Sequence, residues 1–259
     1  MNFKEFPREE YKENILFEVI FQARFPEIMK ISREEPVDFQ EKIRKHYPES
    51  GLNIPSLPKD MPEEIKKLIT SDKEFFFFSE EKDWQISLAK NFIALSCKGK
   101  YLNYADFRAR LEEILKIFNT VYEPSYFTRI GLRYRNIVND ELLISLNGRN
   151  IRKLIPDKIF PELKEENSEN TKSLEKTIHL DDGNIKINAT YALATVSGEF
   201  GQKQINNKES YIIDIDCFIE EKTKGVKNVL TKCDEFKENE WNIFQWSITD
   251  DLRRAMGKK

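Results

Sequence analysis

The sequence predicts an α+β protein in which antiparallel sheets are each packed by long amphipathic helices, in two sequential halves of similar element order. Three observations support this prediction. Several segments alternate apolar and polar residues with the two-residue period of a half-buried strand. Two long segments show the apolar stripe of an amphipathic helix, and in each half the strands precede the helix. Because the strands follow one another through short connections, we expect antiparallel pairing.

The first half, residues 1–139, begins with a strand in which alternate residues from Ile15 to Phe25 are apolar, and Pro26 blocks its continuation. A proline-rich connector, PESGLNIPSLPKDMP, interrupts the half, and Asn103 is placed to cap its long helix, with Asp106 three residues later. The elements expected here are strands at 14–25, 74–79, 84–89, 91–97 and 126–138, and helices at 37–47, 62–70 and 104–121.

The second half, residues 140–259, contains a polar and weakly patterned stretch at 163–176 that is typical of a mobile connector. Strands are expected near 185–196 and 210–219, and a helix capped by Asp234 is expected from there to about residue 256. The alternative is that the two halves form one compact unit.

The segment RIGLRYRNIV, residues 129–138, places Arg129, Arg133 and Arg135 on one face of a strand. Three interpretations stay open. Acidic residues on neighbouring strands, with Glu18, Asp214 and Asp216 as candidates, could face the arginines at about 5 Å and neutralise them. The arginines could instead bind an anion or a nucleic-acid backbone, or they could belong to a protein interface.

A second charged pattern follows in SYIIDIDCFIE, where Asp214 and Asp216 share one strand face and Glu220 follows. Carboxylates near a strand end, followed by a lysine, are typical of metal-dependent nucleases, since Mg²⁺ prefers hard oxygen ligands. The short spacing to Glu220 also fits a solvated acidic face that ends in a turn.

Aromatic side chains indicate a possible contact surface. Phe75 to Phe78 form an unbroken run, so Phe76 and Phe78 are candidates for a partner interface unless the strand is buried on both faces. In the last helix, Trp241 belongs to the apolar stripe, while Trp246 points elsewhere and could anchor a partner.

No catalytic residue or cofactor is predicted. The two histidines, His46 and His179, lie in contexts typical of surface or capping residues, and the three cysteines are too far apart for a zinc site. The sequence contains neither a GxxxxGK[ST] phosphate loop nor a GxGxxG motif, and only nine glycines in all.

The bulk composition narrows the class of protein further. Lys and Arg number 42 against 45 Asp and Glu, which argues against a generally basic nucleic-acid-binding surface while allowing a local patch. No apolar run is long enough for a membrane span, the N-terminus lacks an apolar signal core, and the few cysteines suggest no disulfide framework. These features predict a soluble cytoplasmic protein.

Five separated segments, between about Tyr11 and Gly257, carry a resemblance to a known family: YKENILFEVIFQARFP, WQISLAKNFIALS, YADFRARLEEIL, FTRIGLRYRN and IFQWSITDDLRRAMG. Together they resemble a sporadically distributed, uncharacterised prokaryotic protein family of about this size. That family has no established activity or cofactor to carry over. Its sporadic occurrence is typical of genes that move horizontally, including those of phage defence and toxin–antitoxin loci.

We therefore expect a non-enzymatic binding or regulatory protein, a component of a prokaryotic defence or toxin–antitoxin locus, with a protein partner or a homo-oligomer. Two alternatives remain from the residues above. One is a nucleic-acid-binding protein that uses the arginine face, and the other is a divalent-metal-dependent nuclease centred on Asp214, Asp216 and Glu220.

Overall fold

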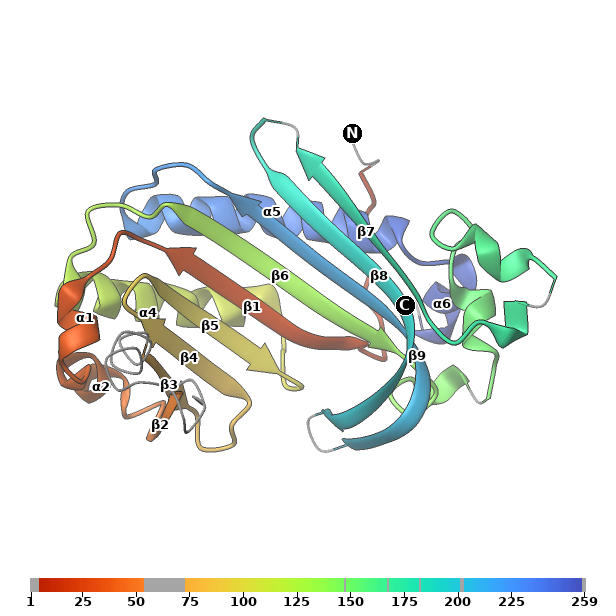
Figure 1. Cartoon of the computed structure of the whole chain (residues 1–259), viewed down its shortest axis with the longest axis horizontal. Coiled ribbons are helices and arrows are strands. Elements are labelled where there is room, and N and C mark those ends of the chain that lie inside the picture. Colours follow the sequence, from red (N-terminus) through yellow and green to blue (C-terminus); the bar gives the residue numbers. More distant parts are fainter. Residues whose placement is uncertain are drawn as a thin grey trace, which may run out of the picture. The chain divides into compact units, whose positions relative to one another are not determined.

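The structure is a computed structural model that describes residues 5–53, 73–146, 148–166, 168–181, 183–200 and 203–257. Nine strands in these residues form one antiparallel sheet, in the order β2-β3-β4-β5-β1-β6-β9-β8-β7 (Figure 1). The strands are β1 (Leu16–Arg24), β2 (Glu49–Asn53), β3 (Glu74–Phe78), β4 (Trp84–Ala89), β5 (Phe92–Lys98), β6 (Arg129–Val138), β7 (Leu174–Asp181), β8 (Lys186–Phe200) and β9 (Lys203–Ile219). The α-helices are α1 (Met29–Arg33), α2 (Val37–Ile43), α4 (Tyr104–Tyr122), α5 (Val226–Trp246) and α6 (Asp250–Ala255). Four short 3-10 helices lie at Ile144–Leu146, Ile151–Leu154, Pro161–Lys164 and Ser168–Asn170.

The single sheet overturns the predicted fold class. An α+β arrangement with separate sheets in two sequential halves is wrong, because β6 hydrogen-bonds to both β1 and β9 and so joins strands from both predicted halves. Separate sheets would each present two open edges of unpaired backbone groups, and joining them satisfies those groups. Most of the described helices are also short, since α1, α2 and α6 contain only five, seven and six residues.

Two compact units are each assembled from segments that are not contiguous in the sequence. Unit 1 comprises Met1–Val19, Leu132–Ile219 and Asp234–Lys259, and unit 2 comprises Ile20–Gly131 and Glu220–Cys233. The domain boundary expected between residues 139 and 140 stays a prediction.

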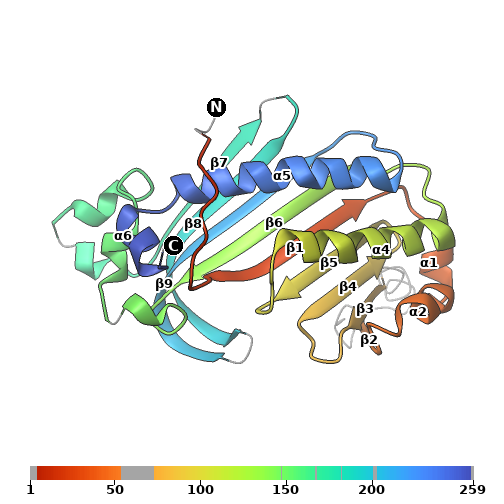
Figure 2. The same ribbon diagram turned by 180° about the vertical axis from the view of Figure 1, so that it is seen from behind.

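Unit 2 is built around α4. Its predicted stripe is confirmed, because Phe107, Leu111, Ile114, Leu115 and Phe118 are all buried. The helix covers one face of the neighbouring strands, where Phe107 stacks on Trp84 of β4 with ring centroids 5.7 Å apart (Figure 2). The predicted cap is also confirmed, since the Asn103 side chain accepts a hydrogen bond of 3.0 Å from the Asp106 backbone N–H.

In unit 1, the later part of α5 lies against β8 and β9 (Figures 1 and 2). Ser247, directly after α5, forms hydrogen bonds with a buried tyrosine of each of these strands. The hydroxyl groups of Tyr191 and Ser247 are hydrogen-bonded over 2.8 Å, and the Tyr211 hydroxyl group donates to the Ser247 carbonyl oxygen over 3.0 Å. The prediction of one helix from Asp234 to residue 256 is wrong. The helix begins eight residues earlier at Val226 and ends at Trp246, and Thr249 caps the separate helix α6 with a hydrogen bond from the Leu252 backbone N–H.

Two strands form where connectors were predicted. β2 occupies the start of the proline-rich segment, and β7 begins at Leu174 inside the stretch interpreted as mobile. The helix predicted near 62–70 lies outside the described residues. None of the helices in the described part of the chain has the length and apolarity needed to cross a membrane.

Candidate functional site: paired arginines on the uncovered face of unit 1

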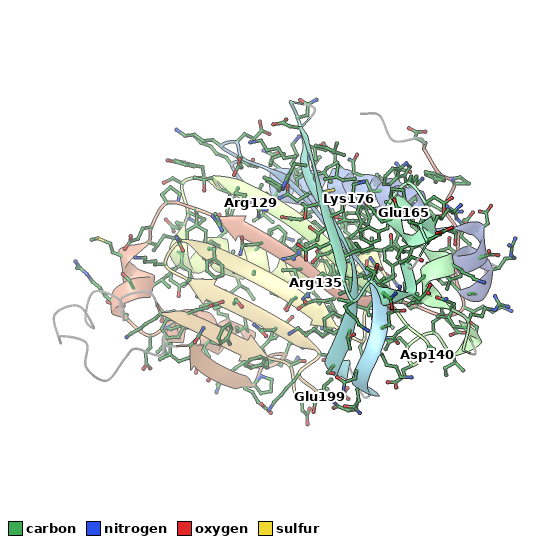
Figure 3. All side chains as sticks on the ribbon, turned by 45° about the vertical axis from the view of Figure 1, so that its right-hand side comes forward. Arg129, Arg135, Asp140, Glu165, Lys176 and Glu199 are labelled. Carbon is green, nitrogen blue, oxygen red and sulfur yellow. The ribbon has the colours of Figure 1, made fainter. Side chains whose placement is uncertain are left out.

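The arginine strand β6 lies between two strands that each carry an acidic side chain next to it. β1 contributes Glu18 and β9 contributes Asp214. Arg133 and Arg135 are two residues apart on β6, so both side chains leave the strand on the same face. Figure 3 shows Arg135 among the strands of unit 1, on the face that α5 does not cover.

Arg133 forms a bidentate pair with Asp214. Its Nε donates to Oδ1 and its Nη2 donates to Oδ2, each over 2.6 Å. This parallel geometry matches a guanidinium to a carboxylate, and the hydrogen bonds raise the pKa of Arg133 above its ordinary value. The Asp214 side chain is only 12% exposed, whereas that of Arg133 is 45% exposed, so the arginine lies over the acid.

Arg135 connects the two acidic residues. Its Nη1 donates to Glu18 Oε2 over 2.8 Å, and its Nε lies 3.4 Å from Asp214 Oδ2. The guanidinium also stands 5.5 Å from the centre of the Phe17 ring, within range of a cation–π contact. Glu18 is 6% exposed and Arg135 is 36% exposed, which repeats the arrangement of a half-exposed arginine over a buried acid.

The predicted pairing across strands is therefore confirmed for Arg133 and Arg135. Two guanidinium groups and two carboxylates face each other, so the four side chains carry no net charge. Removing an arginine would take an opposite charge away from an acid that is largely shielded from water. Arg129, the first residue of β6, belongs to unit 2 and is half-buried.

The pairs continue into a band of polar side chains across β9, β8 and β7. Thr177, Thr190 and Asp214 stand directly opposite one another, and the two threonine hydroxyl groups are 3.0 Å apart. In the next row His179, Asn188 and Asp216 are aligned. We define the polar band as these residues and the two ion pairs: Glu18, Arg133, Arg135, Thr177, His179, Asn188, Thr190, Asp214 and Asp216.

The other face of β9 holds a different kind of acid, Glu240 of α5. Its side chain is 3% exposed, and neither carboxyl oxygen makes a hydrogen bond of good geometry with any described residue, although Cys217 lies close by. Burial, followed by the negative charge of Asp216, raises the pKa of Glu240 well above its ordinary value. The carboxyl group is therefore neutral at pH values where a solvated glutamate is charged.

Sequence reasoning missed Glu240, although a signal was present. Buried positions on α5 recur with helical spacing at Val229, Cys233, Phe236 and Ile243, and Glu240 occupies the place between the last two. Starting the helix at Asp234 hid this stripe, because its first two members lie before the assumed start.

The acidic residues of the nuclease hypothesis are placed as follows. Asp214 is held by both arginines, Asp216 is half-buried on the same face, and Glu220 is exposed just after the end of β9, in unit 2. Within the described residues, no group of three or more His, Cys, Asp or Glu side chains could hold a metal ion.

The remaining candidates lie apart from the polar band. Phe76 and Phe78 are half-buried on β3 with ring centroids 6.2 Å apart, while Phe77 is buried against Phe39. Trp246 is half-buried at the end of α5, with Lys158 Nζ 4.1 Å from its ring centre. Their role as a partner interface stays a prediction.

Both histidines, His46 and His179, are exposed, as predicted.

Comparisons with protein-family models, with curated proteins and with solved structures find no match for this chain.

Proposed function

We propose that this chain is a non-enzymatic binding or regulatory protein of the cytoplasm, and that the polar band on unit 1 contacts a polypeptide partner. The observation that carries the proposal is the layering of the ion pairs, in which half-exposed arginines lie over buried acids. The three cysteines are buried and form no disulfide, which is typical of proteins in a reducing compartment.

The layering leaves hydrogen-bond donors on a surface without net charge. The pairs with Asp214 and Glu18 use Nε and Nη2 of Arg133 and Nη1 of Arg135, and Nε of Arg135 faces Asp214. Each guanidinium therefore keeps a terminal nitrogen with two N–H groups that these contacts do not use. Such donors suit the backbone carbonyl groups of a polypeptide.

A nucleic-acid backbone fits this surface less well. Phosphate binding depends on an excess of positive charge and weakens steeply with salt. Here two carboxylates neutralise two arginines, and the added members of the band are hydroxyl, amide, imidazole and carboxyl groups. We therefore expect partner binding that changes little with ionic strength, in a defence or toxin–antitoxin setting of the kind that the sequence resemblance suggests.

Site-specific photo-crosslinking tests the proposal. A benzophenone amino acid replaces Thr190 in the polar band or, as a control matched in residue type, the exposed Thr231 on α5. In cells of the source organism, the Thr190 position should yield one discrete protein adduct that persists in 0.5 M salt, on the order of tenfold stronger than at Thr231. Arg133→Ala together with Arg135→Ala should abolish it.

Three outcomes would contradict the proposal. Equal labelling from both positions would show that the band is not a binding surface. An adduct that disappears on nuclease treatment would identify a nucleic acid as the partner. Cleavage of DNA or RNA by the purified chain with Mg²⁺ or Mn²⁺, lost in Asp214→Asn, would identify a nuclease.

A further inference from the structure

Unit 1 ends in a long and accessible edge strand. β7 is the last strand in the order of the sheet and pairs with β8 along all eight of its residues. Its side chains at Glu175, Lys176, Thr177, His179 and Asp181 are exposed. The backbone groups on the outer side of such a strand are a template for one more strand.

We propose that the edge strand β7 pairs antiparallel with β7 of a second copy of this chain, centred on Thr177. The partner is argued from complementarity of charge between two copies of the same strand. Antiparallel pairing of two identical edges requires a two-fold axis perpendicular to the sheet. In each possible register, one residue of β7 therefore faces the same residue of the second copy across the axis. Because β7 is short, only a few such registers exist.

Most of these registers bring like charges together. An axis at Lys176 makes the two copies of that lysine face each other, and an axis at Glu175 does the same for two glutamates. An axis at Ile178 places Glu175 opposite Asp181 of the second copy. Like charges directly opposite each other in a sheet are destabilising.

The register centred on Thr177 places no like charges of β7 opposite each other. Glu175 faces His179 of the second copy, and symmetry repeats this contact on the other side of the axis. The His179 Nδ1 lies 2.7 Å from Asn188 Oδ1 within its own chain, so Nδ1 donates there and Nε2 is directed to other partners. A protonated His179 then offers Nε2–H to the facing carboxylate.

The opposite side of the strand also matches itself in this register. Leu174, Ile178 and Leu180 are half-buried on that side, next to Ala189 and Ile187 of β8. Leu174 faces Leu180 of the second copy, again twice, and Ile178 faces the aliphatic stem of Lys176. Pairing therefore extends the apolar layer on one face while it joins the polar side chains on the other.

Cysteine crosslinking tests both the dimer and its register. Thr177→Cys places the new thiol opposite its own copy, at a Cα separation of roughly 4.5–5.5 Å that suits a disulfide. The matched control is Glu175→Cys. In the proposed register, residue 175 lies roughly 13 Å along the strand from residue 175 of the second copy. The native Cys97, Cys217 and Cys233 are fully buried and do not compete.

With oxidised glutathione, Thr177→Cys should form a covalent dimer at least tenfold faster than Glu175→Cys. Adding Glu175→Lys should slow this crosslinking about tenfold, and adding His179→Glu to that variant should restore the rate to within about threefold, since the facing charges are then exchanged. Circular dichroism checks that every variant is folded.

Equal crosslinking at residues 175 and 177, or no effect of the charge changes, would overturn the proposal. A wild-type chain that sediments as a monomer at about 100 µM, together with slow crosslinking of Thr177→Cys, would also overturn it. Thr177 and His179 also belong to the polar band, but the crosslink is measured on the purified chain with no other polypeptide present, so the two proposals fail separately.

Discussion

Asp214 of β9 and Glu240 of α5 lie on opposite faces of the same strand, in opposite surroundings. Asp214 lies on the uncovered face of the strand and is held by Arg133 and Arg135. Glu240 packs from α5 onto the other face, where its carboxyl oxygens make no hydrogen bond of good geometry with the described residues. At the first, guanidinium groups replace the water that the carboxylate has lost. The second keeps its proton because the pKa of a carboxyl group rises when burial disfavours its charged form. The two acids therefore differ in what surrounds them: Asp214 has two arginines beside it, and Glu240 is shielded from water among apolar residues of the strand and helix.

The comparison predicts its largest effect at Arg135. Arg135→Ala removes the ion pair of Arg135 with the buried Glu18, and we expect the free energy of unfolding to fall by about 3 kcal/mol at pH 7. Urea denaturation measures this change. Glu18→Gln in the same chain should recover much of the loss, because the uncompensated charge is then removed.

A control separates this effect from the loss of any arginine. Arg254 forms an exposed pair with Asp251, and Arg254→Ala should change the free energy of unfolding by no more than about 0.5 kcal/mol. If both alanine variants lose the same stability, the acids beneath the arginines are not the cause.

The second prediction is a substitution that raises the free energy of unfolding. The folded chain holds a proton on Glu240 that the unfolded chain releases once the pH exceeds the ordinary glutamate pKa, so this residue lowers stability as the pH rises. Glu240→Gln removes that dependence. We expect the variant to be more stable than wild type by roughly 1–3 kcal/mol at pH 8, with the advantage shrinking toward pH 4.5.

Denaturation midpoints between pH 4.5 and 8.5 measure the difference, and the exposed Glu235 supplies the control on the same helix. Glu235→Gln, an exposed substitution, should change the midpoint at pH 8 far less than Glu240→Gln does. A Glu240→Gln variant that is less stable than wild type at pH 8 would mean that the carboxylate is ionised and compensated in the fold.

The sequence predicted one side of this comparison and missed the other. Alternation within RIGLRYRNIV and SYIIDIDCFIE was enough to place arginines and acids on polar strand faces, and pairing between them was one of three interpretations that the sequence left open. Glu240 depended on where α5 begins. Asp234 resembles a helix cap, but the helix starts at Val226, directly after Gly225 adopts a φ of 76° that favours glycine. A local cap signal therefore competed with a longer helix that is stabilised by tertiary packing.

The fold was missed for a related reason. Local patterns identified most strands, but which strands become neighbours depends on contacts between distant segments, such as β6 with β9. β7 escaped notice because its sequence, LEKTIHLD, is rich in charged and polar residues, as edge strands often are.

The smallest predicted effect is at Arg133. Asp214 keeps its contact with Arg135 when Arg133 is removed, and Arg133 is the more exposed of the two arginines. We therefore expect Arg133→Ala to lower the free energy of unfolding by about 1 kcal/mol, well below the cost of Arg135→Ala. A double-mutant cycle with Asp214→Asn isolates the coupling between the two side chains. The coupling should weaken in 1 M salt because Arg133 is partly solvated, whereas the Arg135–Glu18 coupling should change less because its acid is more deeply buried. Equal salt dependence of the two couplings would mean that the depth of the acid does not set the strength of the pair.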